Sequence, residues 1–123
     1  EGYERVEGVR LSTGEVFDCD MVVVGKGVTP NVSCIRDTEI QQGTGILVSD
    51  MMETSVRSIY AAGDIAEGYD IARGRPWVNA LWSSAVWQGR IAGYNMAGRR
   101  IAYLGDVALN SVSFGDKCLI TLA

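Results

Sequence analysis

Residues 54–64, TSVRSIYAAGD, constrain the fold of this chain more than any other segment. A short β-branched and aromatic run, Ile59 and Tyr60, passes through two alanines to Gly63 and then to the carboxylate of Asp64. This order predicts a buried strand over 58–62 that stops abruptly at an acidic residue. In open α/β sheets ligands bind at the carboxyl ends of the strands, so Asp64 is expected at such an edge.

The residues alone leave two interpretations of Asp64 open. An aspartate that follows glycine commonly satisfies its own backbone in a turn. Alternatively, the small residues 61–63 leave room for a ligand, and a carboxylate is a natural acceptor for sugar-like hydroxyl groups.

The composition indicates a globular domain and excludes several functions. The 123 residues suffice for one ordinary domain, and 47% of them are hydrophobic against 21% charged. A net charge of −4 without a basic block argues against nucleic acid or an anionic membrane as partner. No apolar run approaches the roughly 18 residues of a membrane span, and no signal-peptide pattern is found, so a cytoplasmic location is expected.

Metal and thiol chemistry find little support in the sequence. The cysteines Cys19, Cys34 and Cys118 form no closely spaced pair, and histidine is absent. We therefore expect no metal site and no His-based triad, and we assign no catalytic residue. The cysteines are interpreted as reduced structural thiols, with a redox role for Cys34 as the alternative.

The hydrophobic pattern predicts a mixed α/β organisation. Residues 4–19 are expected to form a hairpin, and MVVVG at 21–25 is typical of a strand buried on both faces. Gly25–Gly27 is not a dinucleotide-binding fingerprint, because Pro30 replaces the third glycine. Further predicted elements are a short helix ending near Ile35, strands at 45–48, 112–114 and 119–122, and a loop at 66–78.

The clearest helix is predicted for residues 80–97. Asn79 is expected to cap its start, and Gly98 stands where a helix-ending glycine is common. Its N-terminus would offer backbone N–H groups and a positive dipole end to an electron-rich ligand. A largely small face is expected to pack closely; its members are Trp82, Ala85, Val86, Gly89, Ala92, Gly93 and Met96.

Taken in order, several segments resemble the C-terminal part of the pyridine nucleotide-disulfide oxidoreductase family. The branch resembled contains rubredoxin reductases, NADH oxidases and nitrite reductase flavin subunits. The matching residues are GVRLSTGE at 8–15, CDMVVVGKGVTPN at 19–31, GILVSDMMETSVRSIYAAGDIAE at 45–67, ALWSSAVWQGRIAGYNMAG at 80–98 and NSVSFG at 110–115.

The resemblance implies a partial three-layer, Rossmann-like FAD/NAD(P)-binding domain with an added β-hairpin. Residues 1–24 would end an NAD(P)H-binding domain, and 25–105 would be the second segment of an FAD-binding domain. Residues 106–123 would open an α+β interface, or dimerisation, domain.

The resemblance also implies four cofactor-binding residues. Gly63 and Asp64 would lie at the ribityl chain of FAD, where Asp64 would accept a hydrogen bond from a ribityl hydroxyl. Backbone N–H groups near Leu81 and Trp82 would face the pyrimidine edge of the flavin. There the helix dipole would stabilise negative charge.

The function implied is that of a fragment of an FAD-dependent NAD(P)H oxidoreductase. In the parent, hydride would pass from NAD(P)H to FAD and then to a disulfide, O₂ or a redox protein. The chain begins at Glu1 rather than methionine, ends in a predicted strand at Ala123, and lacks both G-x-G-x-x-G fingerprints. We therefore expect the isolated chain to bind FAD weakly or not at all, and to self-associate through bare sheet edges.

Two other functions remain open. The chain could be a non-catalytic interaction or scaffold module that keeps the fold without the cofactor. It could also be a small β-rich binding domain with a closed antiparallel sheet and no buried acid near the start of helix 80–97. The electron acceptor and the choice between NADH and NADPH are not encoded in these residues.

Overall fold

The structure is a computed structural model that describes residues 4–122. Glu1 and Ala123, on which the expectation of a longer parent partly rests, lie outside the described residues. The elements in chain order are β1 (Gly8–Arg10), β2 (Val16–Asp18), the 3₁₀ helix η1 (Val32–Ile35), β3 (Ile46–Leu47), β4 (Ala66–Asp70), β5 (Arg75–Trp77), α1 (Trp82–Met96), β6 (Leu109–Phe114) and β7 (Lys117–Leu122).

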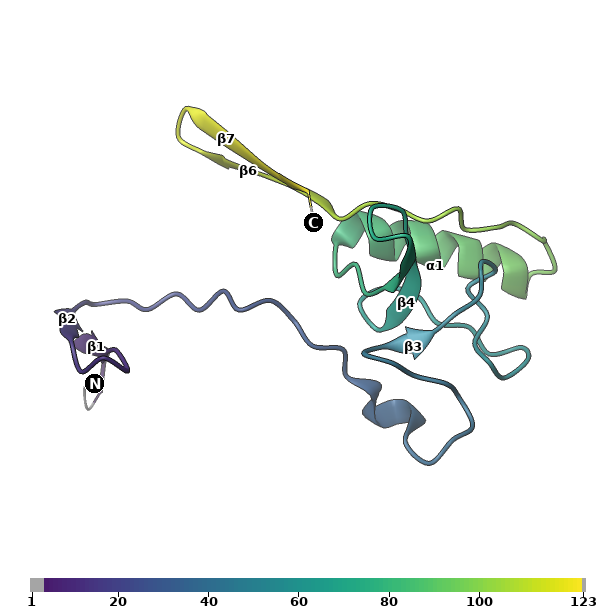
Figure 1. The fold of residues 1–123 in the computed structure, drawn as a ribbon, viewed down its shortest axis with the longest axis horizontal. Coiled ribbons are helices and arrows are strands. Elements are labelled where there is room, and N and C mark those ends of the chain that lie inside the picture. The colour runs from purple at the N-terminus through teal and green to yellow at the C-terminus, as the bar shows by residue number, and fades with distance from the viewer. Residues whose placement is uncertain (1–3, 123) are drawn as a thin grey trace.

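The central body combines a small mixed sheet with α1, so the α/β prediction is confirmed. Its strand order is β3-β4-β5, with β3 parallel and β5 antiparallel to β4. The two hairpins, β1–β2 and β6–β7, project from this body as separate ribbons (Figure 1). The buried hydrophobic core comprises Ile46, Met52, Ala61, Ala66, Ile91, Ala92 and Tyr103.

Close packing against β4 depends on the absence of a side chain at Gly68. A Cβ added there would lie 2.9 Å from the Tyr103 ring and 3.0 Å from Nε2 of Gln88, which projects from α1. A larger residue at this position would therefore force the Tyr103 ring, and to a smaller extent the Gln88 side chain, to move.

The predicted helix is confirmed, and it ends at the predicted glycine. Gly98 has a φ of 82°, and its N–H donates to the carbonyl of Asn95 at 3.0 Å. The N–H of Arg99 donates to the carbonyl of Tyr94 at 2.9 Å, which completes a Schellman motif.

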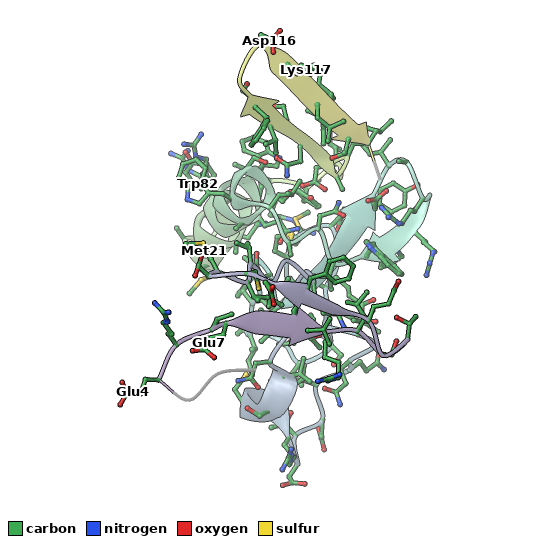
Figure 2. The ribbon with its side chains drawn as sticks, turned by 90° about the vertical axis from the view of Figure 1, so that its left-hand side faces the viewer. Glu4, Glu7, Met21, Trp82, Asp116 and Lys117 are labelled. Carbon is green, nitrogen blue, oxygen red and sulfur yellow. The ribbon has the colours of Figure 1, made fainter. Side chains whose placement is uncertain are left out.

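The predicted start and buried face of the helix were wrong. Leu81 is the N-cap residue and makes no side-chain capping bond, whereas the side chain of Asn79 turns elsewhere. The buried positions of α1 are Ser84, Gln88, Ile91 and Ala92. The predicted face is largely exposed: Trp82 projects outward with 83% of its surface accessible (Figure 2).

Two predicted strands are absent as such. Residues 21–25 are extended but pair with no strand among residues 4–122, and Val23 is 85% exposed. Residues 58–62 contribute only one antiparallel bridge, between Tyr60 and Glu53. Ser58, the first residue of this segment, has a left-handed φ of 66°, so the backbone is not extended there. The segment 66–78, expected to be a loop, instead contains β4 and β5.

The hairpin predicted for residues 4–19 is confirmed, and the strands predicted at 112–114 and 119–122 pair with each other as a second hairpin that was not predicted. β1 and β2 pair antiparallel with Gly8 opposite Asp18, across a turn in which Gly14 has a φ of 92°. β6 and β7 pair antiparallel with Leu109 opposite Leu122, and all of their residues are exposed. The short helix expected before residue 36 is η1.

The side chain of Asn95 ties the end of α1 to two other segments. Its Nδ2 donates to the carbonyls of Met51 and Ile101, each at 2.9 Å, and its Oδ1 accepts from the N–H of Ile101 at 2.8 Å. Both amide hydrogens are therefore used, and they join the end of α1 to Met51, 44 residues earlier, and to the segment just after the helix.

None of the helices within residues 4–122 is long and apolar enough to cross a membrane.

Relieving the backbone strain at Ser58 should stabilise the protein. A left-handed conformation costs an L-residue about 1–2 kcal/mol, and glycine gives back about 0.5–1 kcal/mol through unfolded-state entropy. Ser58→Gly is therefore expected to raise the free energy of unfolding by about 0.5–1 kcal/mol in urea denaturation. Ser58→Ala, which keeps the strain, is the control and should not increase stability.

Tyr103 should make the protein sensitive to high pH. Burial raises the pKa of its phenol well above the usual value; the N–H of Gln88 opposes this, and the charges of Asp106 and Asp70 add to it. Since the unfolded phenol ionises near pH 10, the stability from Tyr103 is complete below about pH 10 and declines as pH rises from there.

Tyr103→Phe is therefore expected to lose stability less steeply than the unsubstituted protein above about pH 10, as measured by thermal unfolding across a pH series. Tyr69→Phe, which changes an exposed tyrosine, serves as the control. Equal slopes for Tyr103→Phe and the unsubstituted protein would contradict the assignment.

Candidate functional site

Asp64 lies on the surface, in a turn built by the glycine before it. Gly63 is buried and has a φ of 83°, a conformation that favours glycine. Its carbonyl accepts the N–H of Ala66 at 2.9 Å, and β4 begins at that residue. The turn therefore presents the Asp64 side chain to solvent immediately before the central strand.

The same turn lies against the first half of α1. A Cβ placed on Gly63 would be 3.5 Å from the Cβ of Ala85, so the turn and the helix are in van der Waals contact. Oε1 of Gln88, a side chain only 1% exposed, accepts the N–H of Gly63 at 2.9 Å. The helix thereby holds Asp64 close to its own N-terminal turns.

The N-terminus of α1 is open. Leu81 is extended, with φ −125° and ψ 144°, and its N–H donates to the carbonyl of Asn79 at 2.8 Å. The Trp82 N–H, the first of the helix, has no acceptor among the described residues. First-turn N–H groups carry the positive end of the helix dipole, and no acidic residue in this first turn offsets it.

The structure places the four predicted site residues in two segments that are joined by the contacts of Gly63 with Ala85 and Gln88 of α1. Gly63 and Asp64 come from the turn before β4, and Leu81 and Trp82 from the helix start. An exposed carboxylate beside unoccupied N–H groups suits a ligand that carries hydroxyl groups and an electron-rich edge.

A small cavity adjoins the helix start. Its volume is about 170 Å³, and it is lined by Val28, Pro30, Thr44, Glu67, Trp77, Val78 and Ala80. Glu67 is 8% exposed, and its Oε1 accepts the N–H of Gly45 at 2.7 Å. A Cβ on Gly43 would lie 2.6 Å from the same oxygen, so the absence of a side chain at Gly43 allows the Glu67 carboxylate to approach this loop.

Sequence analysis did not identify a buried polar group behind the helix start. Asp70 is fully buried; its Oδ1 accepts the N–H of Arg73 at 2.7 Å, and its Oδ2 accepts Nη1 of Arg73 at 3.0 Å. Burial alone would raise the pKa of Asp70, but hydrogen bonds from Arg73 and Asn79 and the charge of Arg73 lower it overall. Asp70 is therefore a structural carboxylate.

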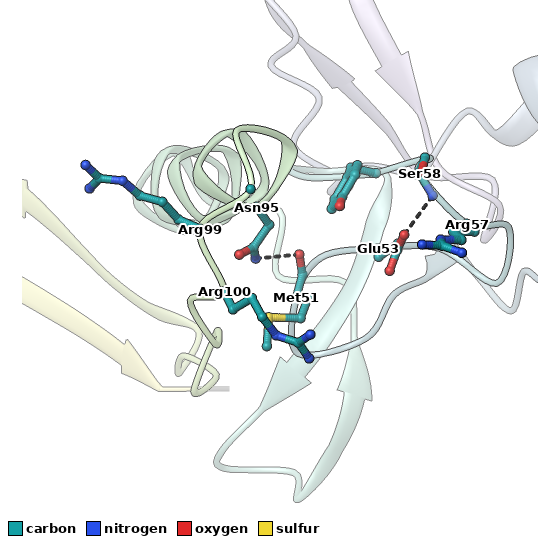
Figure 3. Close-up of a pocket in the computed structure, with 9 residues that line it drawn as sticks. Met51, Glu53, Arg57, Ser58, Asn95, Arg99 and Arg100 are labelled. Carbon is teal, nitrogen blue, oxygen red and sulfur yellow. Dashed lines mark hydrogen bonds between the residues drawn. The ribbon is translucent and has the colours of Figure 1, made fainter.

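A larger cavity of about 450 Å³ lies at the opposite end of α1 (Figure 3). Its lining residues are Met51, Glu53, Arg57, Ser58, Tyr60, Asn95, Gly98, Arg99 and Arg100. The three arginines do not form a single positive centre, because Arg99 points away from Arg57 and Glu53 (Figure 3). None of the predicted site residues lines this cavity.

Within residues 4–122, no group of three or more His, Cys, Asp or Glu side chains could hold a metal ion.

Comparison with known proteins places these features in one family. The family model described as pyridine nucleotide-disulphide oxidoreductase matches residues 1–89. The chain is 37% identical over 119 residues to the NAD(P)H sulfur oxidoreductase (CoA-dependent) of Pyrococcus furiosus, covering 94% of this chain and 26% of that protein. It is 42% identical over 90 residues to the NADH-rubredoxin oxidoreductase of Clostridium acetobutylicum, and the match covers 73% of this chain and 22% of that protein.

Solved structures show the same likeness in three dimensions. A NAD-dependent persulfide reductase from A. fulgidus superposes with a TM-score of 0.86 at 27% identity, covering 94% of this chain and 22% of that one. A FAD-dependent pyridine nucleotide-disulphide oxidoreductase from Desulfovibrio vulgaris superposes with a TM-score of 0.86 at 29% identity, covering 99% of this chain and 31% of that one.

The chain spans about a quarter of the length of the two curated relatives, 26% and 22%. The family match over residues 1–89, the sequence identities and the shared architecture agree with one another. The chain belongs to the pyridine nucleotide-disulphide oxidoreductase family.

Proposed function

We propose that this chain supplies the ribityl and flavin side of the FAD site in an FAD-dependent NAD(P)H oxidoreductase. The observation that carries the proposal is the position of Asp64, an exposed carboxylate held through Gly63 and Gln88 beside the open N-terminus of α1. A hydroxylated chain ending in an electron-rich ring is complementary to this pair of features.

The residues present fit FAD in two respects. The left-handed turn at Gly63 leaves no side chain between Asp64 and the helix, so a ligand can run along this edge. The N-cap residue Leu81 makes no side-chain bond, which leaves the first turn of α1 uncapped.

Each site residue has a separate role in this proposal. Asp64 accepts a hydrogen bond from a ribityl hydroxyl, and the N–H of Trp82 donates to the pyrimidine edge. Leu81 acts through its backbone: its N–H is engaged by Asn79 and its carbonyl accepts the N–H of Ala85 at 2.9 Å, so it shapes the first turn. When bound, FAD supplies hydride acceptance from NAD(P)H and electron delivery to an acceptor.

The acceptor class and assembly belong to the same proposal. The relatives' names specify sulfur and rubredoxin, and we propose a sulfur compound, O₂ or a redox protein for the parent of this chain. We propose that residues 1–24 belong to an NAD(P)H-binding domain, residues 25–105 to an FAD-binding domain and residues 106–123 to an interface domain. The exposed apolar side chains of β6–β7, such as Phe114 at 86%, support self-association through the last of these.

Removal of the Asp64 carboxylate tests the FAD site. In the full-length protein, Asp64→Ala is expected to raise the dissociation constant for FAD about ten- to a hundredfold, since a hydrogen bond to a charged group is lost. Flavin fluorescence titration of the apoprotein measures this. Asp116→Ala, in the exposed turn of β6–β7, is the control.

Unchanged FAD affinity in Asp64→Ala would remove Asp64 from the site. Full-length protein that retains no FAD at all would instead favour the non-catalytic interaction module.

Gln88 should matter for both stability and binding. Gln88→Leu leaves the buried N–H of Gly63 without its acceptor, which costs about 1–3 kcal/mol of unfolding free energy. Because the turn also loses its anchor, weaker FAD binding is expected. Gln42→Leu, at an exposed position, is the control. Lower stability with unaltered FAD affinity would show that Gln88 does not position Asp64.

A further inference from the structure

Asn79 and Asp106 form a buried contact between segments on either side of α1. Nδ2 of Asn79, a residue only 4% exposed, donates to Oδ1 of Asp106 at 2.6 Å. Asn79 lies two residues before the N-cap Leu81, and Asp106 lies in the segment that follows the helix. The contact therefore spans the whole of α1.

Asp106 is itself fixed to the central sheet. Its carbonyl accepts the N–H of Ile71 at 2.9 Å, and its N–H donates to the carbonyl of Tyr69 at 3.2 Å. These two bonds make a parallel bridge between Asp70 and Asp106 at the end of β4. Asp106 therefore anchors the side chain of Asn79 to the end of β4.

The Asn79–Asp106 contact is expected to add little to the free energy of unfolding. Within residues 4–122, Oδ1 of Asn79 and Oδ2 of Asp106 are buried without a well-formed hydrogen bond, although the Tyr103 hydroxyl interacts with the Asp106 carboxylate. A buried acceptor left without a donor costs about 1–3 kcal/mol, and most such atoms in native proteins are satisfied. The N–H and Nη1 of Arg73 bind Asp70, and none of its N–H groups donates to either of these two oxygens.

The Asn79 backbone transmits this position to the helix start. Its carbonyl accepts the N–H of Leu81 at 2.8 Å, and the carbonyl of Leu81 accepts the N–H of Ala85 at 2.9 Å. A displacement of Asn79 therefore moves the N-cap and changes the direction of the first-turn N–H groups.

We propose that Asn79 and Asp106 are positioning residues that aim the first-turn N–H groups of α1 at the bound flavin. The inference rests on the proposed FAD site. It explains why the Asn79 side chain, which could cap α1, instead hydrogen-bonds the carboxylate of Asp106.

The test uses the full-length flavoprotein with three substitutions. Asn79→Ala and Asp106→Ala break the contact. Asp106→Asn keeps an acceptor for Nδ2 of Asn79 and adds an N–H that can satisfy Oδ1 of Asn79. For each, FAD affinity, the flavin absorption spectrum, the reduction potential and the melting temperature are measured.

Asn79→Ala and Asp106→Ala are expected to raise the FAD dissociation constant roughly fivefold, as for one neutral hydrogen bond. They should also shift the flavin spectrum and make the reduction potential more negative, since negative charge on the reduced flavin is less well stabilised. Asp106→Asn should keep the spectrum and potential of the unsubstituted enzyme and melt at a higher temperature.

Two outcomes would overturn the inference. One is a lower melting temperature in the alanine variants with unchanged spectrum and potential, which is the behaviour of a merely structural contact. The other is an Asp106→Asn protein with the altered flavin of Asp106→Ala. If an alanine variant does not fold, Asp106→Asn and Asn79→Ser are judged by the same spectrum and potential.

The Asp64→Ala measurement separates the two proposals. Weakened FAD binding in Asp64→Ala together with an unaltered flavin in the Asn79 and Asp106 variants would overturn only the positioning role. Unaltered binding in all of them would overturn the FAD site itself.

Discussion

The arrangement of the site depends on one buried side chain, the amide of Gln88. It accepts the N–H of Gly63 on one side, and its Nε2 donates to the hydroxyl of Tyr103 at 3.4 Å on the other. Two glycines contribute: Gly63 adopts the left-handed conformation of the turn, and the missing side chain of Gly68 lets Gln88 and Tyr103 approach β4. Gln88 therefore hydrogen-bonds both the turn and Tyr103 while it packs on β4, and the Asp64 position follows from it.

Features that depend on local sequence were predictable. Gly98 stops α1 because a left-handed residue is needed there, and this need is visible in the sequence as a glycine after a periodic segment. The hairpin at 8–18 follows from the turn at Gly14, whereas at 109–122 only the strands were predicted and not their pairing. The turn at Gly63 and Asp64 was one of two interpretations that the sequence left open, but its position against α1 depends on the distant Gln88.

Features decided by distant partners were not predictable. β4 has the sequence AEGYD, which looks like a loop, and it is a strand because β3, β5 and Gln88 surround it. Residues 21–25 show the reverse: a strand-like sequence remains unpaired where no neighbour within 4–122 meets it. Gln88 was overlooked and Asn79 was wrongly predicted to cap the helix, because a polar residue on or before a helix normally faces solvent or caps the end.

The bonds of Asn95 have a consequence for the far end of the helix. By binding the carbonyl of Met51, this side chain closes a loop of 44 residues that contains Gly63, Asp64, Leu81 and Trp82. Loop closure costs conformational entropy once, and contacts inside the closed loop then form among segments that are already confined. Asn95 lies at the opposite end of α1 from Asp64. Its hydrogen bond to Met51 nevertheless limits how far the turn at Asp64 and the helix start can separate.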